Sequence, residues 1–284
     1  MDIIWKSEKD RIEAEFGREV PFLYFPCLKK TGLVNHGFST RLGGVSKGDM
    51  SKLNLGFKRE DDRENVLENY RRITRAIGVE MDSLVLSDQV HKTNIRIVTE
   101  EDRGKGISRA RDYEEVDGFI TNCRGITLTT FYADCVPLFF LDPQKRAIGL
   151  VHSGWRGTVK KIGEKAIKMM GKEFGTREND LIACIGPSIC KDCYEVSQDV
   201  VEEFKREFSP RDWNKIFTGK ENGKYQLDLW KANEIILEEA GILKENIHVS
   251  HLCTCCNPKF LFSHRASKGR RGNLAAFLEL KERT

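Results

Sequence analysis

The sequence lacks a continuous apolar stretch of roughly 18 residues, the length that a membrane-spanning helix needs. It also has little net charge, because 47 lysines and arginines nearly balance 43 aspartates and glutamates and leave only +4. Such a small excess does not indicate a nucleic-acid partner. The first ten residues have no basic segment followed by an apolar one. We therefore expect no secretory signal, no membrane association and a cytoplasmic location.

Proline is also scarce, with seven residues scattered along the chain. We find no internal repeat, no low-complexity run and no linker rich in Pro, Gly or Ser. One continuous domain over residues 1–284 is therefore predicted. Cysteine is better represented, but nine is an odd number, and a chain without a leader indicates reduced thiols rather than a disulfide framework.

Helices are predicted where apolar residues recur every three or four positions and a cap residue or a glycine marks an end. This pattern covers residues 62–78, 158–175, 197–208 and 228–241. Short β-branched or aromatic segments predict strands at 83–86, 94–99, 118–121, 126–131, 136–141, 147–151, 181–185 and 247–251. Residues 136–141 and 147–151 are apolar on both faces, which is typical of a covered sheet. The predicted class is α/β or α+β, with sheets sandwiched by helices.

One further segment, residues 100–115, is polar and punctuated by glycine. We interpret it as an exposed loop.

Three residues beside predicted strand ends suggest a reactive site. His91 follows one strand, Cys135 lies between two others, and His152 ends a fourth. Two imidazoles and a thiolate suit Zn²⁺ or copper, and three protein ligands with an open position are the usual catalytic arrangement. The same residues also permit a metal-free site, in which Cys135 is a nucleophile and His152 its base. Spacing alone does not separate these hypotheses.

A second cysteine group comprises Cys190, Cys193, Cys253, Cys255 and Cys256. Four of these five would suffice for a structural zinc site. However, adjacent cysteines point in different directions, and the two pieces lie 60 residues apart. The sequence alone therefore favours buried free thiols.

The segment NHGFSTRLGGVS at 35–46 contains two adjacent glycines together with Ser39 and Arg41. A glycine-rich turn with an arginine suits an anion such as phosphate, although an ordinary turn explains it as well. The segment SKGRRGN at 267–273 is basic but has no interleaved aromatic residues, so it does not indicate a nucleic-acid surface.

Taken together, these segments resemble the YfiH-type family, whose members have been called laccase-domain or polyphenol oxidoreductase proteins and purine nucleoside phosphorylases. The resemblance covers about residues 35–280. Besides the segment at 35–46, it rests on SDQVHKTNI at 87–95, YADCVPLFFLD at 132–142, VHSGWRGT at 151–158 and ACIGPSICKDCYEV at 183–196. The chain departs from the residues that many family members have at Tyr132 and at Val151 and Ser153, which flank His152. Neither departure removes a candidate ligand.

The resemblance implies a four-layer α/β/β/α sandwich with mixed sheets, similar to the catalytic domain of cytotoxic necrotizing factors. It implies that His91, Cys135 and His152 are catalytic and bind Zn²⁺, with Cu²⁺ possible at the same site. Many members have Gly-Arg just before an Ala-rich C-terminal helix. Here Gly272-Asn273 occupies that place, preceded by Arg270 and Arg271.

The activity implied by the resemblance is phosphorolysis of adenosine, inosine, guanosine and methylthioadenosine, with adenosine deamination as a second activity. Purine nucleosides and phosphate are thus the expected partners, and either a monomer or a dimer is compatible. Arg41 and Arg156 are candidates to hold phosphate, because a guanidinium matches its oxygens in a fork. Ser39 and Gln89 are candidates to contact the ribose or the base.

Two alternative functions remain at this stage. One is the metal-free Cys135–His152 hydrolase or deamidase, which assigns no task to His91. The other is oxidation of phenols by a single copper. Multi-copper laccase chemistry is disfavoured, because its mononuclear and trinuclear sites need more histidines than the six in this chain.

Overall fold

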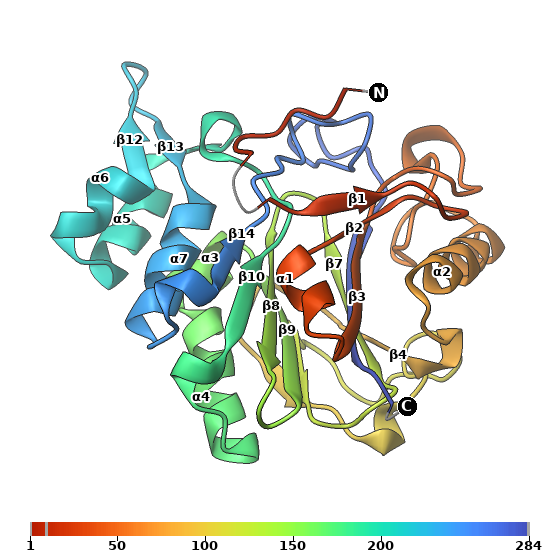
Figure 1. The fold of residues 1–284 in the computed structure, drawn as a ribbon. Coiled ribbons are helices and arrows are strands. Elements are labelled where there is room, and N and C mark those ends of the chain that lie inside the picture. Colours follow the sequence, from red (N-terminus) through yellow and green to blue (C-terminus); the bar gives the residue numbers. More distant parts are fainter. Residues whose placement is uncertain (1, 9–10, 283–284) are drawn as a thin grey trace.

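The computed structural model describes residues 2–8 and 11–282, and its core is a pair of six-stranded mixed sheets (Figure 1). The first sheet has the order β1 (Glu13–Glu15), β2 (Phe22–Tyr24), β3 (Val34–Ser39), β15 (Leu274–Leu280), β7 (Thr127–Tyr132) and β4 (Leu84–Leu86). All of its pairs are antiparallel except β4 with β7. The C-terminal strand β15 therefore lies in the middle of this sheet, between β3 and β7.

The second sheet has the order β14 (Ile247–Val249), β10 (Ile182–Ile185), β8 (Val136–Asp142), β9 (Ala147–Ser153), β6 (Gly118–Thr121) and β5 (Ile95–Ile97). Its two edge strands run parallel to their neighbours, and the central pairs are antiparallel. A separate small antiparallel sheet contains β11 (Glu195–Val196), β13 (Tyr225–Leu227) and β12 (Phe217–Gly219).

Helices cover the outer faces of the two large sheets. On the first sheet this is α2 (Arg63–Ile77), and a short helix α1 (Pro26–Lys30) packs near β3. On the second sheet lie α3 (Trp155–Val159), α4 (Ile162–Phe174) and α7 (Leu229–Glu239), whereas α5 (Gln198–Glu207) and α6 (Trp213–Ile216) pack against α3, α7 and the small sheet. Three buried apolar clusters fill the spaces between these layers. The expected α/β class and helix–sheet–sheet–helix layering are confirmed.

The helix ends follow the residues that predicted them. Asp62 accepts a hydrogen bond from the backbone N–H of Glu64 at the start of α2, and Gly78 ends that helix in the left-handed region. The helix predicted over residues 158–175 is divided between α3 and α4, with Lys161 at a φ of 54°. Ser197 precedes α5, but its hydroxyl bonds to Asp199 rather than to a helix N–H.

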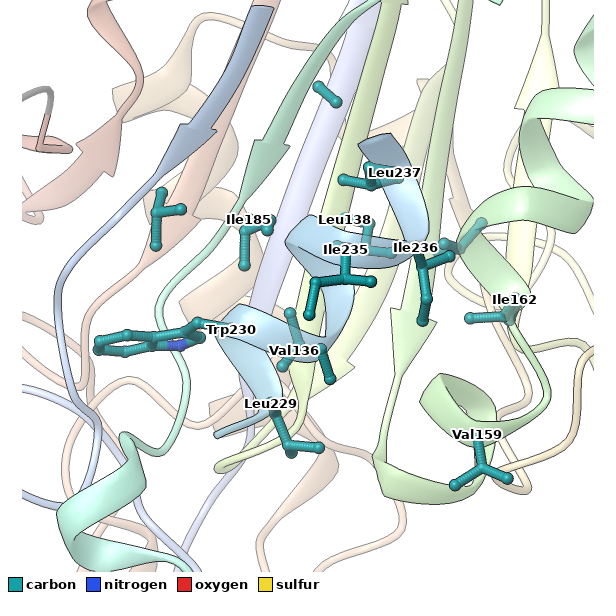
Figure 2. Packing of buried hydrophobic residues seen from close by; sticks show 14 of the residues in the cluster. Val136, Leu138, Val159, Ile162, Ile185, Leu229, Trp230, Ile235, Ile236 and Leu237 are labelled. Carbon is teal, nitrogen blue, oxygen red and sulfur yellow. The ribbon is translucent and has the colours of Figure 1, made fainter. Parts of the chain in front are cut away.

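The outer helices bury their apolar stripe against strands that are buried on both faces. Every residue of β8 and β9 is buried. Figure 2 shows side chains of α7 lying over these strands, among them Leu229, Trp230, Ile235, Ile236 and Leu237. This packing holds the strand ends that carry Cys135 and His152 in fixed positions. In the described part of the chain, no helix combines the length and the apolar character that crossing a membrane requires.

Two expectations differ from the structure. The resemblance implies an Ala-rich helix after Gly272-Asn273, but this segment is strand β15, in which Phe277 pairs with Gly37 on one side and with Thr129 on the other. Its Leu and Ala residues favour a helix locally, but burial in the centre of a sheet overrides that preference. Residues 100–115 are not simply an exposed loop either, because Asp102 is buried and binds Lys105 Nζ at 2.8 Å.

Candidate functional site

Three side chains meet at one end of the second sheet. His91 lies on the loop after β4, Cys135 in the turn between β7 and β8, and His152 on β9. Pro137 pairs directly with His152 in the β8–β9 ladder, which brings the turn before β8 beside the histidine. Each residue offers a ligand atom within 4.8 Å of the other two, and Cys135 Sγ lies 3.8 Å from His91 Nε2.

The backbone at this site is unusual for non-glycine residues. His91 has a φ of 61° and Asp134, immediately before Cys135, a φ of 89°. Positive φ values of this kind are costly and are often found at functional sites, where the surrounding structure enforces them. Asp134 is held by Thr254 Oγ1 at 2.6 Å and by the backbone N–H of Arg265 at 2.7 Å. These contacts fix the turn that presents the Cys135 thiol.

Asp117 connects two of the three side chains, and the sequence analysis did not identify it. Its buried carboxylate accepts a hydrogen bond from His152 Nδ1 at 2.9 Å. It also accepts the backbone N–H groups of Val90, His91 and Lys92. The bond to Nδ1 leaves His152 Nε2 as the nitrogen available to a metal, an outer-shell arrangement common around metal-bound histidines. The one feature of the sequence that could have pointed to Asp117 is its position as an acidic residue directly before a predicted strand.

The electrostatics favour a charged Cys135–His152 pair. Burial raises the pKa of the Cys135 thiol, but His152 and then His91 outweigh it and lower this pKa to about 6. Burial lowers the pKa of His152, whereas Cys135 and Asp117 together raise it to about 9. In the metal-free chain at neutral pH the sulfur is thus a thiolate, the form that both coordinates metals and attacks electrophiles.

The donor set fits a metal ion. A tetrahedral ion with metal–nitrogen and metal–sulfur distances of about 2.1 and 2.3 Å separates N and S ligands by about 3.6 Å. The observed distance from Cys135 Sγ to His91 Nε2 is close to this, at 3.8 Å. Gly154 leaves this space open, since a Cβ there would lie 3.0 Å from His91 Cδ2 and 3.1 Å from Cys135 Sγ. Two imidazoles and one thiolate satisfy three positions of Zn²⁺ or copper and leave one for a reactant.

The pKa of Cys135 gives a testable pH dependence. Because it is lowered to about 6, the thiolate of the chelator-treated chain is present above that pH and is lost as the pH falls through it. We expect iodoacetamide to label Cys135 with a half-maximal rate near pH 6, against about 8.5 for an ordinary thiol. Mass spectrometry of the peptide containing Cys135 measures this. Adding Zn²⁺ should slow the labelling at every pH; equal rates with and without the ion would contradict metal ligation.

A cavity of about 910 Å³ opens beside the three side chains, a size suited to a small organic ligand. It is lined by loops and strand ends, with residues that include Phe57, Arg59, Arg111, Phe131, Tyr194, His264, Arg265 and Arg271. A smaller cavity of about 280 Å³ shares His91, Asp134 and Cys135 with the first. Two of the three candidate ligands, His91 and Cys135, therefore line both cavities, and His152 lines the larger one.

The four predicted substrate-binding residues do not line one common cavity in the structure. Gln89 lines the large cavity, but its amide binds both backbone groups of Phe131. Arg156 lines the smaller cavity and lies 4.3 Å from the Trp155 ring. Ser39 is buried on β3 and accepts the backbone N–H of Ala275.

Arg41, like Ser39, lines neither cavity. Its guanidinium donates to the backbone oxygens of Ser51 and Pro258. The glycine-rich segment at 35–46 is thereby joined to the loops at 51 and 258, and this arginine is occupied by protein acceptors.

Two other arginines, Arg59 and Arg271, line the large cavity and share one acceptor, and the sequence analysis did not identify them as a pair. Arg59 Nε and Arg271 Nη1 both donate to Asn273 Oδ1. Among the described residues, Arg271 Nε is buried without a hydrogen-bond partner. Burial and then the charge of Arg59 lower the pKa of Arg271 to about 10. Two adjacent guanidiniums with an unused buried donor are suited to bind phosphate oxygens.

Comparison with known proteins identifies a matching family and similar proteins. A family model described as "Multi-copper polyphenol oxidoreductase laccase" matches residues 35–281. Purine nucleoside phosphorylase YlmD of Bacillus subtilis (strain 168) is 38% identical over 250 residues, which cover 87% of this chain and 88% of that protein. The crystal structure of YlmD from Geobacillus stearothermophilus matches with a TM-score of 0.88 at 32% identity, covering 96% of this chain and 100% of that one. The Bacillus licheniformis hypothetical protein YfiH also gives 0.88, at 31% identity over 94% and 99% of the two chains.

Proposed function

This chain belongs to the YfiH-type family, the one described as multi-copper polyphenol oxidoreductase laccase, and we propose that it is a metal-dependent purine nucleoside phosphorylase. The observation that carries the proposal is a His–Cys–His ligand group at the edge of a cavity whose wall holds two adjacent arginines. The proposed substrates are adenosine, inosine, guanosine and methylthioadenosine, with adenosine deamination as a second activity. We assign this activity to one catalytic domain formed by the whole chain.

In this proposal His91, Cys135 and His152 hold Zn²⁺, and Cu²⁺ competes for the same ligands because it binds such groups more tightly. When bound, the ion supplies Lewis-acid chemistry at its open position. Asp117 keeps the Nδ1 proton of His152 in place and fixes the His91 backbone, so both rings stay aimed at one point. This His–Cys–His group alone, in a chain with six histidines, does not supply the several copper sites of a laccase.

Phosphorolysis requires phosphate to be held beside the ribose. A phosphate oxygen forms a bond to C1′ while the bond from C1′ to the base breaks. The departing base takes the bonding electrons and gains the proton that the attacking hydrogen phosphate releases. We assign the phosphate to Arg59 and Arg271, since their guanidiniums lie in the cavity and Arg271 keeps a free buried donor. The cavity also offers the rings of Phe57, Phe131 and Tyr194, on which a purine base can stack.

A second function is favoured by one observation, the charge state of the Cys135–His152 pair. A thiolate beside an imidazolium is the ground state of many cysteine nucleophiles, so the metal-free hydrolase or deamidase has a physical basis here. It gives His91 no role, although this ring lies 3.8 Å from the sulfur. A covalent nucleoside-derived adduct on Cys135 that forms and decays at the catalytic rate would establish this second function.

The proposed activity is tested by incubating the purified chain with adenosine or inosine, with and without inorganic phosphate. We expect free base and ribose 1-phosphate only when phosphate is present. Adenosine deamination should continue without phosphate, because its nucleophile is water. A chelator should stop both reactions and added Zn²⁺ should restore them. Product formation at full rate in the chelated enzyme, or base release that does not depend on phosphate, would contradict the proposal.

A further inference from the structure

A second group of potential ligands lies outside the site described above. The sulfur atoms of Cys190, Cys193, Cys253 and Cys256 all lie within 4.8 Å of one another. The sequence analysis favoured separate buried thiols partly because the two pieces are 60 residues apart, but in the structure the two pieces lie side by side. Strands β10 and β14 are parallel neighbours, so the segments that follow them emerge side by side at the same sheet edge. A bridge between Ser188 and Cys253 continues this pairing beyond the strands.

We propose that these four cysteines bind a structural Zn²⁺ ion. Each segment supplies two cysteines separated by two residues, the spacing of tetrathiolate zinc sites. A tetrahedral ion with zinc–sulfur bonds of about 2.3 Å separates its sulfurs by about 3.8 Å. Cys193 Sγ and Cys256 Sγ are 3.5 Å apart, and every other pair lies within the same 4.8 Å limit.

The surroundings of the group combine backbone N–H donors, burial and a nearby cation. Cys253 Sγ accepts the backbone N–H of Cys190 at 3.2 Å and that of Cys256 at 3.4 Å. Donors of this kind stabilise a negatively charged sulfur. Cys190 is 3% exposed and Cys253 fully buried, which shields half of the ligands from solvent. Lys6 Nζ, held at 2.9 Å by Asp192 between the first two cysteines, places a positive charge beside the cluster.

The alternative to a bound ion is a pair of disulfide bonds among the four cysteines. All nine cysteines of the chain are free in the structure. Disulfides require sulfurs to associate two by two, whereas here four sulfurs converge on one point. Convergence of four thiols is the geometry expected for one tetrahedral ion, so the zinc interpretation accounts for all four positions at once.

The proposed ion lies behind the wall of the catalytic cavity. Asp134, which directly precedes Cys135, is hydrogen-bonded to both cysteine segments. Its backbone oxygen accepts a hydrogen bond from the Ile189 N–H, and its carboxylate accepts one from Thr254 Oγ1. Arg265, a cavity residue, donates to the backbone oxygen of Cys193. Tyr194, which follows Cys193, lines both cavities. Zinc would therefore join two loops that position the substrate wall, without itself touching the substrate.

The test uses the full chain with the first site removed, as the triple variant His91→Ala, Cys135→Ala and His152→Ala. We expect this variant, purified with a reductant, to retain one zinc per chain by elemental analysis. X-ray absorption should show four sulfur ligands at about 2.3 Å. Adding Cys193→Ser and Cys256→Ser should remove that zinc, whereas adding Cys255→Ser should not. Cys255 is the matched control because it lies in the same loop but outside the four-sulfur group.

The metal content of the triple variant does not depend on whether the serine variants fold. A triple variant that contains no zinc, or whose zinc has nitrogen or oxygen ligands, would overturn the proposal. A disulfide between any two of the four cysteines, found by mass spectrometry of the unreduced chain, would overturn it as well. If Cys255→Ser removed the zinc and the substitutions of Cys193 and Cys256 did not, the proposed ligand assignment would be wrong.

Discussion

Replacing His91, Cys135 or His152 by alanine is expected to remove the catalytic metal and to lower kcat/KM by more than about 100-fold. The magnitude follows from outer-shell partners, whose loss already costs about 10- to 100-fold in metal affinity or activity. A direct ligand should matter more, because two remaining ligands compete poorly with water for the ion. Elemental analysis and initial rates with inosine and phosphate measure the two effects. The circular dichroism spectrum should be unchanged, since the packed sheets do not depend on these side chains.

Cys123→Ala is the matched control for Cys135→Ala, because Cys123 is also partly exposed but belongs to neither ligand group. It should keep full activity and metal content. Asp117→Asn extends the series: His152 and the His91 backbone would lose a buried carboxylate acceptor, and we expect a metal affinity about 10- to 100-fold weaker. Full activity with a stoichiometric ion in Cys135→Ala would refute the ligand assignment. An active His91→Ala that loses its ion would instead support the Cys135–His152 nucleophile.

Local patterns in the sequence predict the elements whose ends are marked by particular residues. Asp62 and Gly78 delimit α2 because one caps free N–H groups and the other adopts a φ of 83°. The apolar runs at 136–141 and 147–151 predict strands covered on both sides, and β8 and β9 are buried throughout. These properties depend on neighbouring residues only, so they can be inferred without knowing the fold.

Properties that depend on which strands pair cannot be obtained in this way. Strand β15 has a helix-favouring composition and is extended only because β3 and β7 flank it. Cys190 and Cys253 come together because β10 and β14 are neighbours, and nothing within either segment specifies that neighbour. Distance along the sequence was therefore a poor argument against a shared site.

The candidate site likewise contains features that the sequence could predict and features that depend on tertiary contacts. Positions at predicted strand ends suggested His91, Cys135 and His152, the family resemblance implied that they are metal ligands, and the structure brings their donor atoms together. Asp117 carries no motif of its own, and its role follows from three backbone N–H groups on another loop. Arg41 had the local signal of an anion site, a glycine-rich turn, but its donors are directed to backbone oxygens. A guanidinium's surroundings are set by tertiary contacts, which the turn sequence does not encode.

Arg271→Ala is expected to raise the apparent KM for phosphate by about 10- to 100-fold and to leave phosphate-independent deamination of adenosine nearly unchanged. A hydrogen bond to a charged group contributes about 1.5–3 kcal/mol, and each 1.4 kcal/mol corresponds to a tenfold change in affinity. Arg271 lines the large cavity, so truncation should remove a charge-assisted hydrogen bond to phosphate. Arg59→Ala should act in the same direction, because Arg59 shares the acceptor Asn273 with Arg271.

The neighbouring Arg270 provides the matched control, since it is exposed and paired with Asp49 at 2.8 Å. Arg270→Ala removes the same charge one residue away and should leave the KM for phosphate unchanged. Arg271→Lys separates charge from geometry: a lysine keeps the charge but not the two-pronged contact, so an intermediate KM is expected. Arg41→Ala tests the sequence-based assignment directly. If it raises the phosphate KM while Arg271→Ala does not, the anion binds near the glycine-rich turn at 35–46, and the arginine pair in the large cavity is not the phosphate site.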